Sequence, residues 1–318
     1  MNLTAEGRRL IERAVVLIED NTPPEIAAQL YASAGRSWMN QDRRRALQLL
    51  ERAADLFLRL RDQMSLASIS NSLGNMHYSL GHYDKATRSY EMAREILTDA
   101  GKTGEVLFTH YGLGLVAAAT NDLAGARRHF ASTFDLTCVQ KDEFLKNYVS
   151  LAIAEMDFME DKLDVGIERM HCILNRLRSL QPRLLLHAAL LSMGAFLIAL
   201  GRLPEARDCT AEALAEVRDG ENYIRQLCLQ QLALLGALAG RLPEAARLIG
   251  FVEAGVPSAN KDDRTTANYV HHRLSRLLAD GLDEAARLTY AAEGAKWREE
   301  QAIAYAQTEL IARWERFI

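Results

Sequence analysis

The stretch TDAGKTG, from Thr98 to Gly104, is a segment of this 318-residue chain that could bind a phosphate group. GKT ends the phosphate-binding loop of many nucleotide-binding proteins, in which backbone N–H groups surround the phosphates. The full motif also requires a glycine five residues before Gly101, where this chain has Ile96, and no strand precedes the stretch. We therefore interpret Gly101 as a glycine that ends a helix in a turn.

The histidines do not form a metal-binding pattern either. His271 and His272 are adjacent, which on a helix points their side chains about 100° apart and disfavours a shared metal ion. His77 and His82 have no third ligand nearby in the sequence. There is no HExxH motif, no serine nucleophile elbow and no compelling pair of carboxylates. We therefore expect no catalytic residue, no metal site and no cofactor, and we expect that the chain is not an enzyme.

Composition argues against several other classes of function. A net charge of -4 gives no electrostatic footprint for direct nucleic-acid binding. No apolar run follows the charges at the amino terminus, so a secretory signal is not expected. The uncharged stretch from Leu184 to Gly201 has the same position in its repeat as the first helix of every other repeat. We therefore interpret it as a buried helix and not as a membrane span. We expect a cytoplasmic protein whose reduced cysteines are buried: Cys138, Cys172, Cys209 and Cys228.

The hexapeptide GRLPEA occurs at Gly201–Ala206 and again, 39 residues later, at Gly240–Ala245. The positions that precede its final alanine at intervals of about 40 residues are all occupied by small residues. The position 12 residues before each of these is also occupied by a small residue. Large, mostly apolar residues recur in further columns. The two small columns are Ala46, Ala86, Ala126, Gly166, Ala206 and Ala245, and Ala34, Gly74, Gly114, Ala154, Gly194 and Ala233.

This pattern predicts a helical hairpin that is repeated six times. Two antiparallel helices approach closely where side chains are small, and the large columns fill the space between hairpins. In each corner we expect glycine to end the first helix, leucine to enter the core, proline to open the second helix and glutamate to favour its positive N-terminus. The repeated hexapeptide is therefore interpreted as a structural corner and not as a site.

The second repeat, NSLGNMHYSLGHYDKATRSYEMA from Asn71 to Ala93, resembles a tetratricopeptide repeat (TPR). The resemblance implies an all-α, right-handed α-solenoid of about six TPR-like hairpins with capping helices at both ends. The period near 40 exceeds the usual 34 residues and overlaps that of armadillo and HEAT repeats, which are the alternative class. The matching positions are Leu73, Gly74, Gly81, Tyr83, Ala86, Tyr90 and Ala93.

A second resemblance covers both ends of the chain. The opening AEGRRLIERAVVLIED with PPEIAAQLYASAG, the segment LPEAARLIGFVEA, and LDEAARLTYAAEGAKWREEQAIAYA from Leu282 are similar to the C-terminal region of large bacterial ATP-dependent (STAND-type) regulators of the LuxR type and their winged-helix relatives. Pro257, Ser258 and Ala259 stand where that family has a proline pair. The resemblance implies the TPR-like sensor of a signal-responsive transcription regulator. Kinase or cyclase outputs also occur with this architecture, and a free-standing TPR scaffold is the alternative.

The register of the repeat also predicts how the chain is organised. The first helix has the phase of a second hairpin helix, so it is either the remnant of a preceding repeat or a capping helix. Arg273 occupies a small position of the repeat, which indicates a divergent end that Trp297 and Trp314 could cover. The expected organisation is an N-terminal helix in 1–20, six repeats in 21–258 and capping helices in 259–318.

Function would then belong to the groove that a solenoid offers. If the hairpins stack as TPRs do, one face of each first helix lines this groove, and we call this set of positions the inner face. It is rich in aromatic residues and poor in Lys and Arg, so we expect a protein or peptide partner or an apolar small-molecule effector, with a homo-oligomer also compatible. Some of these aromatics could instead fill the core. The inner face comprises Tyr31, Trp38, Asn71, Asn75, Tyr78, Phe108, Tyr111, Tyr148, Leu151, Glu155, Phe158, Leu191 and Gln230.

Overall fold

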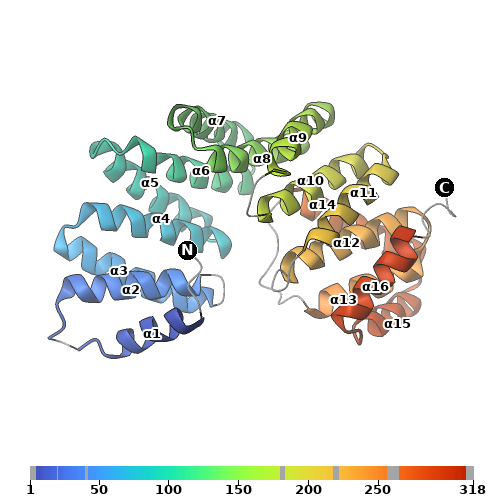
Figure 1. Cartoon of the computed structure of the whole chain (residues 1–318), viewed down its shortest axis with the longest axis horizontal. Helices are drawn as coiled ribbons and strands as arrows, with labels where there is room; N and C mark the ends of the chain where they lie inside the picture. Colours follow the sequence, from blue (N-terminus) through green and yellow to red (C-terminus); the bar gives the residue numbers. More distant parts are fainter. Residues whose placement is uncertain are drawn as a thin grey trace. The chain divides into compact units, whose positions relative to one another are not determined.

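A computed structural model describes residues 5–19, 21–39, 42–179, 183–217, 222–255 and 265–312. Within these ranges the regular structure is helical throughout. The chain divides into two compact units, residues 1–149 and 150–318, and helix α8 (Glu143–Met159) contains the division. Figure 1 shows the helices in chain order.

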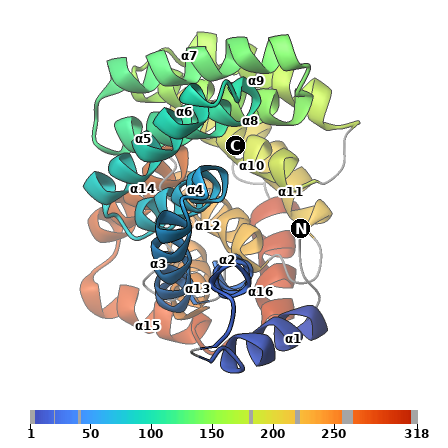
Figure 2. The same cartoon turned by 90° about the vertical axis from the view of Figure 1, so that its left-hand side faces the viewer.

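The first unit is built from successive helical hairpins, as the sequence predicts. Helices α2 and α3, α4 and α5, and α6 and α7 pair most extensively with each other. Figure 2, in which this unit faces the viewer, shows α1 beside α2, against which it packs. The helices of the unit are α1 (Ala5–Val16), α2 (Pro24–Trp38), α3 (Arg43–Leu60), α4 (Gln63–Ser79), α5 (Tyr83–Asp99), α6 (Thr103–Ala119) and α7 (Leu123–Gln140).

The small residues of the first helices accept large rings from the second helices. The ring of Tyr90, which is 1% exposed, lies against both Gly74 and Gly112, where an added Cβ atom would come within 2.5 Å and 2.4 Å of it. Phe130 lies against Gly114 in the same way. Interiors are packed too densely to absorb such overlaps, so these glycines set how closely the hairpin helices approach. The role predicted for the small columns is confirmed at Gly74 and Gly114.

The corners between paired helices use left-handed residues at a spacing near 40. Gly201 and Gly240, which begin the two GRLPEA hexapeptides, have φ angles of +74° and +79°. Gly81, Asn121 and Asp161 precede Gly201 at the same spacing and also have positive φ. The hexapeptide is thus a corner, and its arginine and glutamate form an ion pair in both copies. Gly101, with φ of +66°, lies in the turn between α5 and α6, as expected for TDAGKTG.

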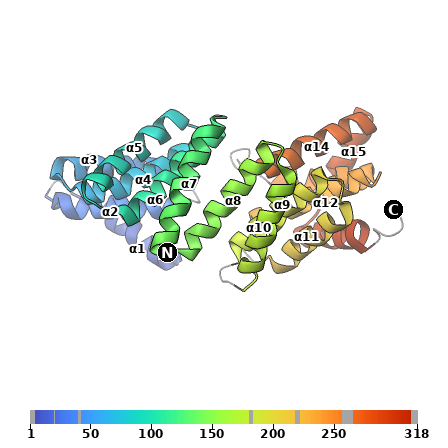
Figure 3. The ribbon, with the colours of Figure 1, turned by 90° about the horizontal axis from the view of Figure 1, so that it is seen from above.

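The second unit continues the hairpin pattern around a very apolar helix. Helices α10 and α11 pair, as do α12 and α13, and α10 packs between α9 and α12 (Figure 3). Leu190, Phe196 and Ile198 of α10 are fully buried, as expected for the uncharged stretch. None of the described helices is long and apolar enough to cross a membrane. The helices after α8 are α9 (Leu163–Leu177), α10 (Leu184–Ala199), α11 (Leu203–Glu216), α12 (Asn222–Leu238) and α13 (Leu242–Gly255).

The last helices depart from the hairpin order. Helix α13 packs directly on α15 (Glu284–Gly294), although α14 (Thr265–Gly281) lies between them in the sequence. Helix α16 (Glu299–Tyr305) and the π-helix η1 (Ala306–Ala312) follow, and η1 packs on α12. The ring centroids of Trp297 and Tyr305 lie 4.6 Å apart. Trp314, the segment from Pro257 to Ala259 and the expected boundary at 258/259 lie outside the described residues.

One expectation about the core is wrong. Cys138 and Cys172 are exposed, Cys209 is half-buried and only Cys228 of the four cysteines is buried. The two exposed cysteines lie on second helices, α7 and α9, on the side that faces solvent. Period and composition alone therefore did not locate them.

Candidate functional site

In the second unit, helix α14 covers the inner face. It packs mainly on α12 and α10, more than on its sequence neighbours α13 and α15. The predicted inner-face residues Glu155, Phe158, Leu191 and Gln230 all lie against it, as the following contacts describe. Leu151, also predicted there, is buried. The repeat positions expected to line a groove therefore hold a helix of the same chain.

Glu155 holds the first turn of α14. One carboxylate oxygen, Oε1, accepts hydrogen bonds from the Thr266 hydroxyl at 2.7 Å and the Ser192 hydroxyl at 2.6 Å. The other, Oε2, accepts from the Thr266 backbone N–H at 2.9 Å. An N–H in the first turn has no partner within its own helix, and a carboxylate is favoured at this positive end. Thr266 and Ser192 are 2% and 1% exposed, so these bonds are shielded from water.

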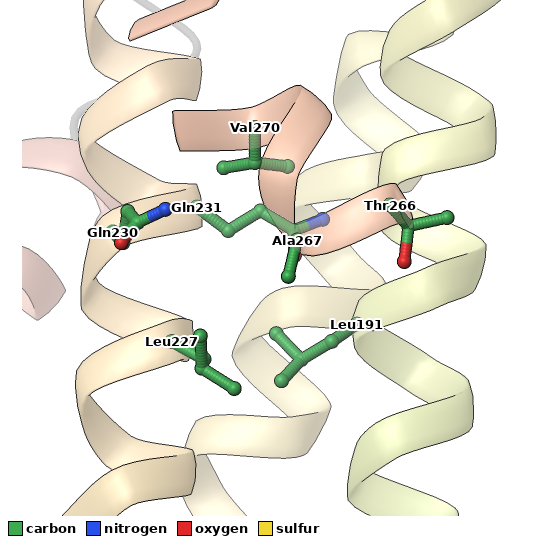
Figure 4. Close-up of a pocket in the computed structure, with 7 residues that line it drawn as sticks. All are labelled: Leu191, Leu227, Gln230, Gln231, Thr266, Ala267 and Val270. Carbon is green, nitrogen blue, oxygen red and sulfur yellow. The ribbon is translucent and has the colours of Figure 1, made fainter. Parts of the chain in front are cut away.

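Apolar and amide side chains complete the contact with α14. The Phe158 ring packs edge-on against Phe196 of α10 at 5.0 Å and against Tyr269 of α14 at 5.1 Å. Leu191 and Gln231 face Thr266, Ala267 and Val270 of α14 across a void of about 10 Å³, as Figure 4 shows. Among the described residues, Nε2 of Gln231 has no hydrogen-bond partner although the side chain is 2% exposed. Helix α14 therefore fits this surface closely but not completely.

In the first unit the inner face is only partly exposed. Asn75 of α4 is exposed, and Phe108 of α6 is 52% exposed. Asn75 is held in place because its Oδ1 accepts a hydrogen bond from the Tyr90 hydroxyl at 2.7 Å. Asn71, on the same helix, is half-buried, and its Oδ1 has no hydrogen-bond partner in the described part of the chain. The Arg36 guanidinium group of α2 donates a hydrogen bond to the Ser68 hydroxyl of α4, the neighbouring first helix, at 3.0 Å.

The remaining aromatic residues of this inner face are half-buried and packed on neighbouring side chains. Tyr111 lies on Phe130, with ring centroids 5.9 Å apart, and burial raises the pKa of Tyr111, so its hydroxyl stays neutral. Burial also raises the pKa of Tyr148. The ring contacts of the other members are Tyr31 with Arg52, Trp38 with Arg45, Tyr78 with Tyr83 and Tyr148 with Phe144. An uninterrupted row of exposed aromatics is therefore not present, because several rings fill space between helices.

The arrangement favours recognition of a protein segment. The described residues contain no group of three or more His, Cys, Asp or Glu side chains that could hold a metal ion. What the inner face offers is an exposed ring, an amide fixed by a hydrogen bond and, in the second unit, a carboxylate already bound to a helix N-terminus. Sequence reasoning missed α14 as the occupant. The available signal was Arg273 in a small position, followed by a stripe of buried residues at Val270, Leu274 and Leu278.

Comparisons with known proteins agree on the fold. No protein-family model matches the sequence, and no curated protein sequence matches it. The structure is similar to that of BtubC (BKLC) from P. vanneervenii, with a TM-score of 0.52 and 18% identity over 65% of this chain and 85% of BtubC. It is also similar to yeast Tom70, with a TM-score of 0.52 and 16% identity over 96% of this chain and 62% of Tom70. The apo form of RapI matches with a TM-score of 0.49 and 9% identity over 95% of this chain and 91% of RapI.

The chain has a TPR-like helical repeat fold. At such identities the similarity concerns the fold alone.

Proposed function

We propose that this chain is a non-enzymatic binding module that receives a helical segment of a partner protein on the inner face of its first unit. The observation that carries the proposal is the position of α14 in the second unit. Leu191 and Gln230, which face α14, each lie three residues before the small-column residue of their own helix. Asn71 and Tyr111 occupy the same position of the repeat in α4 and α6. Asn75 stands in the register of Glu155, and Phe108 in that of Leu227. Equivalent positions in the two units would thus bind equivalent ligands.

The exposed residues indicate the chemistry of the partner. Phe108 offers an aromatic anchor, which an apolar stripe on a partner helix would cover. Asn75, fixed by Tyr90, offers an amide group that can bond polar groups at the edge of that stripe. The inner face contains Asn71 and Asn75 but none of the lysines and arginines of a carboxylate clamp. The partner would therefore be an amphipathic helix and not a free C-terminal carboxylate.

We further propose that the module is the sensor region of a cytoplasmic, signal-responsive bacterial transcription regulator. The support is the similarity of the opening helices, the LPEAARLIGFVEA segment and the tail to that region of LuxR-type and winged-helix ATP-dependent regulators. Binding would then shift the equilibrium of an attached ATPase and output domain by its differential affinity for two states. A free-standing scaffold would bind the same partner without such a response.

The first test compares proteins captured from native lysate by the chain and by two variants. Phe108→Ser changes a 52% exposed residue of the inner face, and Leu58→Ser, which changes a 59% exposed residue of the second helix α3, is the matched control. We expect at least tenfold less captured partner with the inner-face variant and no loss with the control. Equal capture by both variants would place the binding surface elsewhere. In the intact protein, partner addition should change the output activity of the wild type and not that of the inner-face variant; a scaffold would respond in neither.

A further inference from the structure

We propose that α14 is an internal, displaceable ligand of the second unit. Its seat, formed by Glu155, Phe158, Leu191, Ser192 and Gln231, would be a second binding site for a partner helix. The partner would be an amphipathic helix with Thr or Ser in its first turn, like α14 itself. This inference concerns the second unit and does not depend on a partner for the first unit.

The end of the stack of hairpins includes helices other than α14. Helix α13 packs directly on α15, and η1 packs on α12. In the chain order of a regular repeat, α14 would instead pair with α15, yet these two helices make little contact. The contacts of α13 with α12 and α15, and of η1 with α12, are direct and do not pass through α14.

Helix α14 has the character of a helix that binds in a groove. Thr266, Val270, Leu274 and Leu278 are spaced four residues apart, and all four are buried. His271, His272, Ser275, Arg276 and Asp280 on its other side are exposed. Amphipathic helices that lay one apolar stripe into a groove are a recurrent mode of peptide recognition. The same stripe is the feature that a competing partner helix would need.

The seat is polar where α14 begins, and this polarity makes exchange feasible. The Glu155 carboxylate, the Ser192 hydroxyl and the Gln231 amide would be rehydrated if α14 left, so the empty seat would not be a purely apolar patch. The hydrogen bonds that Glu155 accepts from Thr266 also fix where the bound helix starts. An apolar core contact would provide neither the register nor a hydratable surface. We infer that the carboxylate selects the N-terminal turn of the helix.

Within the described structure, the fit of α14 leaves one buried amide group of its seat unsatisfied. A void of about 10 Å³ separates its first turns from α10 and α12, and the Gln231 Nε2 atom beside it has no hydrogen-bond partner among the described residues. A partner helix that bonded this amide would satisfy a buried donor that α14 leaves unsatisfied. A partner helix that makes this additional hydrogen bond could therefore displace α14 from the seat.

The test uses the full chain and a synthetic peptide of residues 265–281. Thr266→Ala with Val270→Asp weakens α14 while leaving every residue of the seat unchanged, and His271→Asp, on the exposed side of α14, is the matched control. We expect the peptide to bind the weakened variant at least tenfold more tightly than it binds the wild type or the control, measured by fluorescence anisotropy. Adding Glu155→Gln to the weakened variant should reduce that affinity by about tenfold, because a charged acceptor at the peptide N-terminus is lost.

Hydrogen exchange of the wild-type chain provides an independent readout. Amides of α14 should exchange through a local opening at least tenfold faster than those of α10 and α12. Equal protection of the three helices, or equal peptide affinity for weakened and wild-type chains, would overturn the proposal. Loss of protection in α10 and α12 of the weakened variant would show that α14 is a structural part of the unit, which would also overturn it.

Discussion

Replacing Gly112 with alanine should destabilise the first unit, because the Tyr90 ring already fills the space. A Cβ atom at Gly112 would lie 2.4 Å from two atoms of that ring, and one at Gly74 would meet it from the other side at 2.5 Å. The ring is also held by its hydrogen bond to Asn75. Overpacking of this kind costs about 1–3 kcal/mol, whereas replacing a glycine inside a helix gains about 0.5–1 kcal/mol. We expect a net loss of about 1 kcal/mol or more.

Hydrogen exchange of peptides from α4 to α7 measures this loss within the first unit. Gly104→Ala is the matched control, since it lies in the same helix and its nearest neighbour, the flexible Gln140 side chain, is 3.4 Å from the added atom. The control should leave protection unchanged or raise it.

A double variant identifies the ring as the cause. In a Tyr90→Leu background the ring edge is gone, so Gly112→Ala should lose most of its cost, with a coupling energy of about 1 kcal/mol. The reasoning fails if Gly112→Ala behaves like Gly104→Ala. It also fails if the cost persists undiminished after Tyr90 is replaced.

Three further outcomes test the described packing. Burial lowers the pKa of His110 and of His129. On acidification from pH 7 to pH 5 these two histidines are therefore protonated first in the unfolded chain, which should lower the melting temperature. A variant with both histidines replaced by glutamine should show a smaller decrease. Arg169→Met should cost about 2 kcal/mol in urea denaturation, because it removes the ion-pair partner of a buried aspartate. Burial raises the pKa of Cys209 to about 11, so in a thiol-reagent assay Cys209 should react after the two exposed cysteines, and buried Cys228 only on unfolding.

The repeat could be predicted from the sequence because its cause is local. A small residue at a fixed spacing is needed wherever two helices touch, and a left-handed residue is needed wherever the chain turns between them. Gly74 and Gly81 carry both signals within one hairpin, and the structure uses each as expected.

The occupant of the inner face could not be predicted in this way. Arg273 shows that the register ends, but a stripe such as Val270, Leu274 and Leu278 suits a capping helix as well as a helix laid across the stack. The choice depends on Glu155 and Thr266, which are 111 residues apart and form no local pattern.

Aromatic periodicity has a similar limit. Phe158 and Tyr111 have the spacing of groove residues, yet each packs on a ring of its own unit, Phe196 and Phe130 respectively. Spacing specifies the side of a helix but not what covers that side. Of the aromatic members of the predicted face, Phe108 is the one that the structure leaves exposed.

The regular placement of left-handed turn residues makes the first unit divisible in steps of one period. Excising residues 81–120 would join Leu80 to Asn121, which already has the positive φ that Gly81 provides at the same corner. Helix α4 would then meet α7, and Gly74 would receive the ring of Phe130 where it now receives that of Tyr90. A cut that is not a whole number of periods would not join one hairpin corner to the equivalent corner of another hairpin. The chain therefore has a natural unit of shortening and lengthening, one hairpin at a time.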